Sequence, residues 1–353
     1  VKLFELRNGE CVPVTLGDGT VAAADVSVPV RVCKIIVGDE GIDGVTVDQI
    51  GTRLHPLVHC SPVVSDVAWN DDGTKLTTLR STVMLRNNTN KLLRAIFVPQ
   101  QQQKQQQEQQ QQQQHAAPFF LHIPVGASEP VPLPHILSSA LCVQLFDDED
   151  TPFTGHSDQS VPASAFYTEG KTVLTLPRLT AGTTRREDVF VTMGIELDRS
   201  TFAGDGFALS TISFNAPFSF TNTLACTADF CVSEISPKQK QKMLQAAARK
   251  SHHQQPQKQQ QLAEVAGAGA AEAEEENKKV PVFEGDLDLR LASGETHTTY
   301  RIDPRKTVYV TLSGLHNFRA ATLELRAESS ETHLRKLKIV DGNGFKLDLQ
   351  VEV

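Results

Sequence analysis

Two stretches of this chain carry the same succession of sequence features. Each begins with a strand-like run that ends on an asparagine-bearing turn, and a second strand-like run then leads into a low-complexity tract. A turn that contains a glycine and a further strand-like run follow the tract. The first copy covers 81–145 and has its asparagine at Asn87, and the second covers 214–312 and has its asparagine at Asn222. A duplicated unit of this kind indicates a repeat array, in which each copy is one supersecondary unit.

Low-complexity sequence interrupts both copies at the same point, before the glycine turn. The first insertion, 100–117, is nearly pure glutamine, and the second, 237–279, runs from basic and Gln-rich through Ala-rich to acidic sequence. Such segments lack the apolar side chains that offset the entropy of ordering, so we expect both to be disordered. Met243–Lys250 is predicted to form a short helix within the second. The shared position supports the repeat assignment, because a surface loop lengthens at little cost in closure entropy.

Strand signals dominate the remaining sequence. Phe345–Val353 alternates apolar and polar residues, which places its apolar side chains on one face. The Asp341–Gly344 segment before it tolerates positive φ, so Leu337–Val353 is predicted to form a hairpin. Further strands are predicted at Asp286–Leu291, Val173–Leu176, Val189–Val191 and Thr307–Leu312. Many short strands and few helical stretches predict an all-β fold of tandem β-sandwich-like repeats, with two long disordered low-complexity insertions.

The phase of the repeat divides the chain into three segments. Residues 1–38 are expected to be the end of a truncated β repeat, since Phe4–Val14 resembles the sequence around Gly126. Residues 39–200 and residues 201–353 are expected to be one β repeat each. Each of these two repeats contains one insertion, and the second ends in the predicted hairpin.

Composition argues against several classes of function. The formal net charge is −8, whereas a general nucleic-acid binder usually has a basic excess with interleaved aromatic residues. No run of about twenty apolar residues occurs, and the first residues lack the pattern of a secretory signal. We therefore expect a soluble piece of a longer chain, since it starts at Val1 without a Met. The six cysteines are scattered without CxxC spacing, which predicts buried thiols in a reducing compartment.

Motifs that carry catalysis are missing from the sequence. No GxSxG, HExxH or phosphate-cradling glycine loop occurs. The spacing of His55, His59 and Cys60 places both imidazoles on one face, but a zinc site needs a further ligand nearby. These residues otherwise mark a strand end with partly exposed histidines, and the acidic run Asp147–Asp150 is predicted to be a solvated turn. We expect no enzyme activity, no metal and no cofactor.

The repeated asparagines are the main candidates for a binding site. Asparagine tolerates left-handed geometry and bonds its own backbone, so Asn87 and Asn222 can each be turn formers. A side-chain amide also donates and accepts at once, so each can instead anchor a bound peptide strand at an exposed sheet edge. A related question concerns Pro130–Pro134, a Pro-x-Pro string. It either occupies such a peptide site in cis or marks a strand edge.

Five segments together carry a resemblance to a known family. They are the asparagine-bearing segments Val83–Leu92 and Ala216–Cys226, the turns at Gly126 and Gly294, and the segment Val47–Leu57. In their order and duplication they resemble the adaptor-binding repeats of the vacuolar protein sorting-associated protein 13 family. The resemblance covers nearly all of the chain outside the two insertions.

The resemblance implies a function that the residues alone do not show. Members of the family are very long, rod-like proteins that bridge two organelle membranes and carry lipids along a hydrophobic groove. Their repeat array docks adaptor proteins through Pro-x-Pro peptides and so selects the target membrane. The repeat asparagine of the family carries over to Asn87 and Asn222 here.

The protein implied in this way is non-catalytic and cytoplasmic. It binds no nucleic acid and has no transmembrane segment. It lies peripherally on organelle membranes and contact sites in vacuolar, endosomal and Golgi sorting, and the rest of the parent chain carries the lipids. The alternative is a purely structural β-repeat spacer that braces the lipid-transfer rod.

Overall fold

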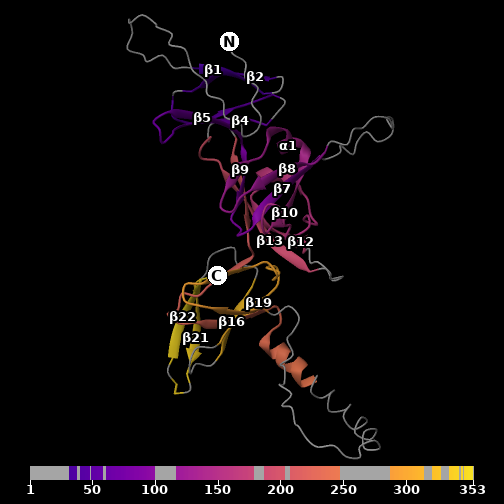
Figure 1. Ribbon diagram of the computed structural model, residues 1–353, viewed down its shortest axis with the longest axis vertical. Helices are drawn as coiled ribbons and strands as arrows, with labels where there is room; N and C mark the ends of the chain where they lie inside the picture. The colour runs from indigo at the N-terminus through magenta and orange to yellow at the C-terminus, as the bar shows by residue number, and fades with distance from the viewer. Residues whose placement is uncertain are drawn as a thin grey trace, which may run out of the picture. The chain divides into compact units, whose positions relative to one another are not determined.

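The computed structural model describes residues 32–37, 40–47, 49–58, 61–99, 117–178, 187–202, 207–246, 287–313, 320–326, 334–341, 343–344 and 346–352. Residues 100–116 and 247–286, which make up most of the two predicted insertions, lie outside them. The chain forms two compact units (Figure 1). Unit 1 comprises Val1–Thr183 and Thr192–Asn215, and unit 2 comprises Thr184–Val191 and Ala216–Val353.

A four-stranded antiparallel sheet in unit 1 contains the two strands on either side of the first insertion. Its order is β11-β10-β7-β8. The strands are β7 (Leu92–Pro99), β8 (Phe119–Ile123), β10 (Ser139–Phe146) and β11 (Val161–Pro162). The register aligns Ala95 of β7 with Leu121 of β8 and Val143 of β10. Alternate residues form a fully buried inner face: Leu93, Ala95, Phe97, Leu141, Val143 and Leu145.

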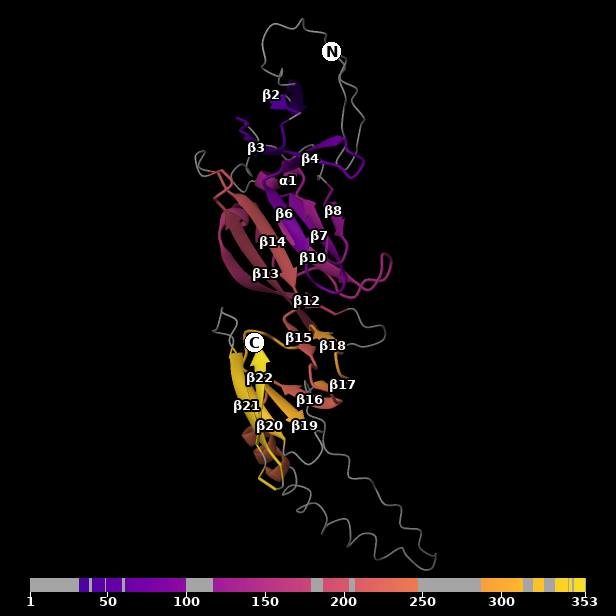
Figure 2. The same ribbon diagram turned by 90° about the vertical axis from the view of Figure 1, so that its left-hand side faces the viewer.

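The second large sheet, which lies in unit 1 apart from the start of β13, has five strands in the order β12-β13-β14-β6-β9. They are β6 (Val83–Asn87), β9 (Ser128–Pro130), β12 (Gly170–Pro177), β13 (Asp188–Asp198) and β14 (Leu209–Asn215). β14 runs parallel to β6, and both lie side by side in Figure 2. Leu85 of β6 and Phe214 of β14 are fully buried, so one face of this sheet also lines the core.

A short extended segment, 152–158, joins the two sheets of unit 1 along one side. The N–H of Phe153 donates to the C=O of Leu145 on β10 at 2.9 Å. Two residues further on, the N–H of Gly155 donates to the C=O of Pro177 on β12 at 2.7 Å. The segment therefore satisfies backbone groups of both sheets along this side of the sandwich.

Five shorter strands and two short helices complete unit 1. β1 (Val32–Val37) pairs with β2 (Glu40–Thr46), and β3 (Gly51–His55), β4 (Val63–Trp69) and β5 (Lys75–Ser81) form a three-stranded sheet. The helices are α1 (Leu133–Ser138) and the 3-10 helix η1 (Ala163–Tyr167). Ile42, Val45 and Val63 form a small core against which Leu133 packs. The three-stranded sheet thus leads directly into β6.

Unit 2 repeats the central part of unit 1. Its four-stranded sheet has the order β17-β16-β19-β20, and β15 pairs with β18. The strands are β15 (Phe218–Thr221), β16 (Ala228–Ser233), β17 (Leu287–Leu291), β18 (Thr296–Thr299), β19 (Val308–Ser313) and β20 (Ala321–Leu325). Val232, Leu289 and Val308 form the centre of the core, and Phe218 and Phe220 of β15 pack against this cluster. The remaining strands, β21 (Leu334–Val340) and β22 (Lys346–Glu352), form an antiparallel hairpin.

The same strand order occurs in both units. The order β8-β7-β10-β11 in unit 1 corresponds to β17-β16-β19-β20 in unit 2, and the pair β6-β9 corresponds to β15-β18. The predicted all-β fold of tandem sandwich repeats is therefore confirmed. The five predicted strand regions are confirmed in β12, β13, β17, β19 and the β21-β22 hairpin. The segment boundaries at 38/39 and 200/201 stay predictions.

The prediction of disorder is wrong at the start of the second insertion, because residues 237–246 form a helix. The predicted helix Met243–Lys250 is confirmed over residues 243–246, and residues 247–250 lie outside the described residues. The helix begins at a capping box. The Ser236 hydroxyl accepts from the N–H of Gln239 at 3.2 Å, and the Gln239 side chain accepts from the N–H of Ser236 at 3.3 Å. Pro237 then occupies the first helical turn, where its missing N–H has no cost.

No helix among the described residues has both the length and the apolar character needed to cross a membrane.

Thr154 provides a test of the segment that joins the sheets. Its side chain is fully buried, and its hydroxyl accepts from the N–H of Leu145 at 3.0 Å. Thr154→Val keeps the shape but leaves this buried N–H without an acceptor, so we expect a loss of about 1–3 kcal/mol in the free energy of unfolding. Hydrogen exchange of the β10 amides measures it. Thr172→Val, at an exposed position of β12, is the control, and equal effects of the two changes would contradict the assignment.

Candidate functional site

Asn87 lies where the chain leaves one sheet of unit 1 for the other. It ends β6, and its backbone pairs with the turn that connects β8 to β9. The N–H of Asn87 donates to the C=O of Ala127 at 3.0 Å, and the N–H of Gly126 donates to the C=O of Asn87 at 2.8 Å. Gly126 has a φ of 74°, a left-handed conformation that favours glycine. The chain crosses between the sheets at Asn87 and again at the Gly126 turn, and these two crossings are hydrogen-bonded to each other.

The side chain of Asn87 is fully buried and bonded on both sides of its amide. Its Nδ2 donates to the carbonyl oxygens of Lys91 at 2.8 Å, Ile123 at 2.9 Å and Pro124 at 3.2 Å. Its Oδ1 accepts from the N–H of Thr89 at 3.0 Å and from the Thr89 hydroxyl at 2.7 Å. An NH₂ group has only two donor hydrogens, so at least one of them is shared between two of the three carbonyl oxygens, and the group has no donor left for another partner.

Asn222 of unit 2 makes the same set of contacts at the same offsets. Its Nδ2 donates to the carbonyl oxygens of Cys226 at 2.8 Å, Leu291 at 2.9 Å and Ala292 at 3.1 Å, and its Oδ1 accepts from the N–H of Leu224 at 3.1 Å. Its backbone N–H donates to Glu295 and its C=O accepts from Gly294, whose φ is 76°. Only 1% of Asn222 is exposed.

We call each of these arrangements an asparagine corner. In unit 1 the amide ties Asn87, the last residue of β6, to the pair of strands that the insertion separates, and in unit 2 it ties Asn222, the residue after β15, to the equivalent pair. In unit 1 the amide joins the end of β6 in one sheet to the start of β7 and the end of β8 in the other. The backbone carbonyls that it binds lie at the end of β8 or just outside β7 and β8. The corner therefore fixes how the two sheets meet.

One contact differs between the two corners. Thr89 supplies a hydroxyl that donates to Asn87 and also lies 2.9 Å from the carbonyl oxygen of Lys91. The residue at the same offset in unit 2 is Leu224, which bonds only through its backbone N–H. The corner of unit 1 therefore has the larger hydrogen-bond network.

These positions bear directly on the two interpretations of the asparagines. Both amides are bonded to the backbone of their own unit. Each binds residues of its own turn and also a strand on the far side of the insertion, so its role goes beyond local turn formation. The signal that was missed is the pairing of each asparagine with a glycine turn across an insertion, at Gly126 and Gly294. That Asn87 and Asn222 contribute to adaptor binding stays a prediction.

The structure gives no support to a metal site at the histidines that the sequence singled out. His55 lies 2.8 Å from the hydroxyl of Ser65, measured between Nε2 and Oγ, and partial burial followed by the nearby Arg53 lowers its pKa. His59 and Cys60 lie outside the described residues. Nowhere in the described ranges do three or more His, Cys, Asp or Glu side chains form a group that could hold a metal ion.

The acidic run Asp147–Asp150 forms a turn, and the proline string Pro130–Pro134 runs from a strand into a helix. Asp148 accepts from the N–H groups of Asp150 at 3.1 Å and Thr151 at 2.8 Å, which confirms the predicted turn. Pro130 pairs with Met84 at the edge strand β9, and Pro132 precedes the first residue of α1. The strand-edge interpretation of Pro130–Pro134 therefore holds, since the string turns into a helix.

The expectation of buried thiols is wrong for one cysteine. Among the described residues, Cys142, Cys226 and Cys231 form no disulfide; the first and third are half-buried, but Cys226 is exposed. The reason is the corner itself, because the backbone carbonyl of Cys226 faces the Asn222 amide. Its side chain then points away from the core.

The fold and the two corners define a class of protein, a tandem array of β-sandwich repeats in which a buried asparagine closes each corner. Comparison with protein families identifies the array. Residues 22–351 match the model of the adaptor binding domain of vacuolar-sorting associated protein 13, and the chain belongs to this family. No curated protein matches the chain.

The contribution of the amide donors can be separated from turn formation by Asn222→Asp. Aspartate forms turns as asparagine does, and it keeps the acceptor for Leu224. It places a carboxylate against three carbonyl oxygens, so we expect unit 2 to lose about 3 kcal/mol or more at neutral pH. The loss should shrink as the pH falls, because the buried carboxyl has a raised pKa and regains a donor when protonated.

Hydrogen exchange in unit 2 peptides measures this change. Asn88→Ala removes an exposed amide of unit 1 whose Nδ2 donates to Asn215 Oδ1 at 3.0 Å, and it serves as a control for the loss of an asparagine amide, with an expected change below about 1 kcal/mol. If the Asn222→Asp variant were as stable as the unaltered chain, the amide donors would contribute nothing and Asn222 would act only as a turn former.

Proposed function

We propose that this chain is a non-catalytic recruitment module of a bridge-like lipid transfer protein. It docks adaptor proteins that carry Pro-x-Pro peptides and so brings the parent protein to organelle membranes and contact sites in vacuolar, endosomal and Golgi sorting. The parent chain supplies the lipid transport. The observation that carries the proposal is the match of the family's adaptor binding domain over residues 22–351.

The architecture supports a binding role over a catalytic one. Two sandwiches with the same strand order present sheet edges and outer faces, and extended peptides bind sheet edges through backbone hydrogen bonds. The polar side chains that are buried in the two corners bond backbone groups of their own unit. They therefore serve the frame of the repeat and leave no reactive group directed at a substrate.

Asn87 and Asn222 enter this proposal as positioning residues. Each fixes the strand ends at one corner of a sandwich, and an adaptor peptide on a neighbouring edge needs those strands in register. The second candidate function, a purely structural spacer, is favoured by the same contacts, since both amides are used within their own units. The two functions differ in whether the folded chain binds peptide.

Fluorescence anisotropy with a labelled Pro-x-Pro peptide separates the two functions. The unaltered chain should give saturable binding, and a peptide with both prolines replaced by alanine should give none. Asn87→Ala and Asn222→Ala should weaken binding at a temperature where hydrogen exchange shows that the altered unit is folded, because the corner holds the binding edge. Asn88→Ala should bind as the unaltered chain does.

The spacer alternative predicts a different pattern. Peptide would then fail to bind at any concentration, while the corner variants would still lose stability. Binding that is unchanged in both folded corner variants would keep the recruitment role but would remove the asparagines from it.

A further inference from the structure

The five-stranded sheet β12-β13-β14-β6-β9 is held together by a strand that comes late in the chain. β14 lies between β13 and β6, as Figure 2 shows. It pairs antiparallel with β13 and parallel with β6. Ser210, Ile212 and Phe214 alternate along β14, and all three are fully buried. β14 thus closes the sheet and contributes to the core.

The asparagine corners align the pair β6-β9 of unit 1 with the pair β15-β18 of unit 2. In unit 1, Leu85 of β6 faces Glu129 of β9. Phe220 holds the place of Leu85 relative to the corner asparagine, and it faces His297 of β18. His297 holds the same place after its glycine turn as Glu129 does. The two pairs therefore have the same register.

Unit 2 has no counterpart of β14 among the described residues. β21 and β22 follow β20 in the chain as β12 and β13 follow β11, and both pairs are hydrogen-bonded. In unit 1 the next strand is β14, which joins this pair to β6. In unit 2 no described strand follows β22, and β21-β22 and β15-β18 remain two separate pairs. The comparison with unit 1 places an open strand position between β22 and β15.

The burial of β15 agrees with an open position beside it. Val83 and Leu85 of β6 are fully buried, and β14 runs beside both of them. Phe218 and Phe220 align with these residues through the corner asparagines. Both are only partly buried, although they pack against the core cluster of unit 2. No described strand of unit 2 supplies the neighbour that β14 provides in unit 1.

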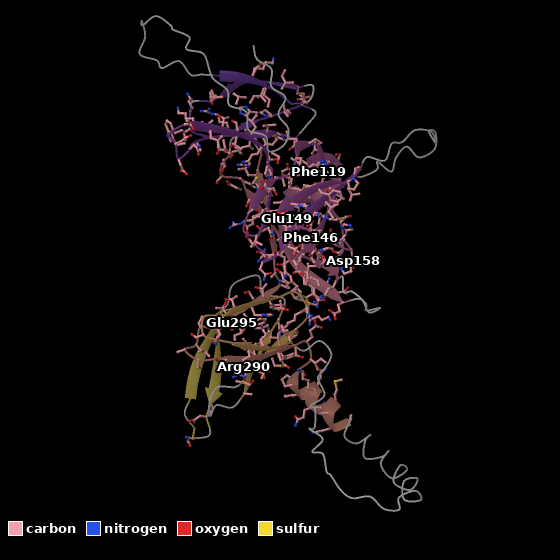
Figure 3. All side chains as sticks on the ribbon, in the orientation of Figure 1. Phe119, Phe146, Glu149, Asp158, Arg290 and Glu295 are labelled. Carbon is pink, nitrogen blue, oxygen red and sulfur yellow. The ribbon has the colours of Figure 1, made fainter. Side chains whose placement is uncertain are left out.

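Backbone hydrogen bonds show which groups of β15 face this position. On the side of β18, the N–H of Asn222 donates to the C=O of Glu295 at 2.9 Å (Figure 3 labels Glu295). Neighbouring residues of a strand direct their N–H and C=O groups to opposite sides, so the groups of Ser219, Thr221 and Thr223 face away from β18. All three residues are exposed.

Unit 1 uses the aligned backbone groups to bind β14. The N–H of Asn88, which aligns with Thr223, donates to the C=O of Phe214 at 2.9 Å. At the other end of β6, the N–H of Ser210 donates to the C=O of Thr82 at 2.8 Å. The edge of β15 therefore presents the row of backbone groups that binds a strand in unit 1, and such a row is a template for pairing.

The order of the strands along the chain indicates what fills the position. β14 is the next strand after β13, and only Ala216 and Pro217 separate its end from β15. The strand that completes unit 1 therefore also leads the chain into the first strand of the next repeat. By the same connection, the strand that completes unit 2 is the one that follows β22.

We infer that unit 2 accepts one more strand, antiparallel to β22 and parallel to β15, and that the segment of the parent protein after Val353 supplies it. This segment is the counterpart of β14, so small or apolar residues alternate along it with polar ones. The inference goes beyond the proposed function, since it concerns how one repeat of the array is completed and joined to the next.

A segment of the same chain is favoured over a strand from another molecule. The connection 199–208 is enough to bring the chain from β13 back along β14, and a connection of that kind after β22 adds only a small closure entropy. A strand from a separate molecule also loses translational and rotational freedom when it binds. The effective concentration of the attached strand is therefore far higher.

The test compares the 353-residue chain with the same chain extended through the next strand of the parent protein. Residue-resolved hydrogen exchange by NMR is the measurement. We expect the amides of Ser219 and Thr221 to exchange about tenfold or more slowly in the extended chain, because they gain acceptors on the added strand. The amides of Phe220 and Asn222, which face β18, are the internal control and should be protected in both chains.

Ser219→Pro removes one N–H directed at the open position and leaves the pairing with β18 intact. Proline is tolerated where the N–H of an edge strand faces solvent. The change should therefore leave the circular dichroism and stability of the 353-residue chain nearly unaltered. In the extended chain it should remove the protection of Thr221, because the added strand then lacks a ladder partner.

Three outcomes would overturn the inference. Equal exchange of Ser219 and Thr221 in the two chains would show that no strand is added there. Protection that survives Ser219→Pro would place the added strand elsewhere. Protection in the unextended chain that grows with protein concentration would assign the position to a strand of a second copy. The recruitment role is tested separately by peptide binding and is unaffected by any of these results.

Discussion

A buried side-chain amide at the corner of each sandwich is the interaction on which the rest of the structure depends. Where a chain crosses from one sheet to the other, the hydrogen-bond ladders end, and backbone carbonyl oxygens near the crossing need donors. Asn87 binds three of these oxygens in unit 1, and Asn222 binds three in unit 2. A neutral amide is suited to the position, because it donates twice and accepts without bringing a charge into the core. Each corner thereby sets the angle and register at which two sheets pack.

The corner also explains where the insertions are tolerated. β7 and β8 are antiparallel, and Asn87 contacts them at the end where Leu93 faces Ile123. The glutamine tract joins them at the opposite end, beyond the pair Phe97 and Phe119. The second insertion joins β16 to β17 in the same way, beyond Val232 and Leu287. A long loop at the far end changes no corner contact, and its closure entropy grows slowly with length.

The sequence predicted the class of fold, the duplication and most strands, because alternation and turn residues are local signals. It also located both corner asparagines. Their partners were not predictable, since Asn87 binds the carbonyl of Ile123 across the whole glutamine tract. The helical residues before Met243 were missed because the capping box at Ser236 and Gln239 was overlooked in favour of composition. The exposed Cys226 was missed because burial depends on which side of a loop faces the core.

The two copies of the repeat share some side chains, which packing and hydrogen bonds require, and differ in others. The inner faces of β7 and β16 must stay apolar, and the corners must keep an asparagine and a glycine turn, because each of these positions is bound by packing or hydrogen bonds in its own unit. The outer face of the four-stranded sheet in unit 1 is less uniform, because Ile96 and Phe146 are buried there whereas Phe120 and His122 are exposed. Arg94, beside Phe146 in unit 1, occupies the place of Asp229, which pairs with Arg290 in unit 2. The two copies of one frame therefore differ in the side chains on the outer face of the sheet, while the corners and the inner faces stay alike.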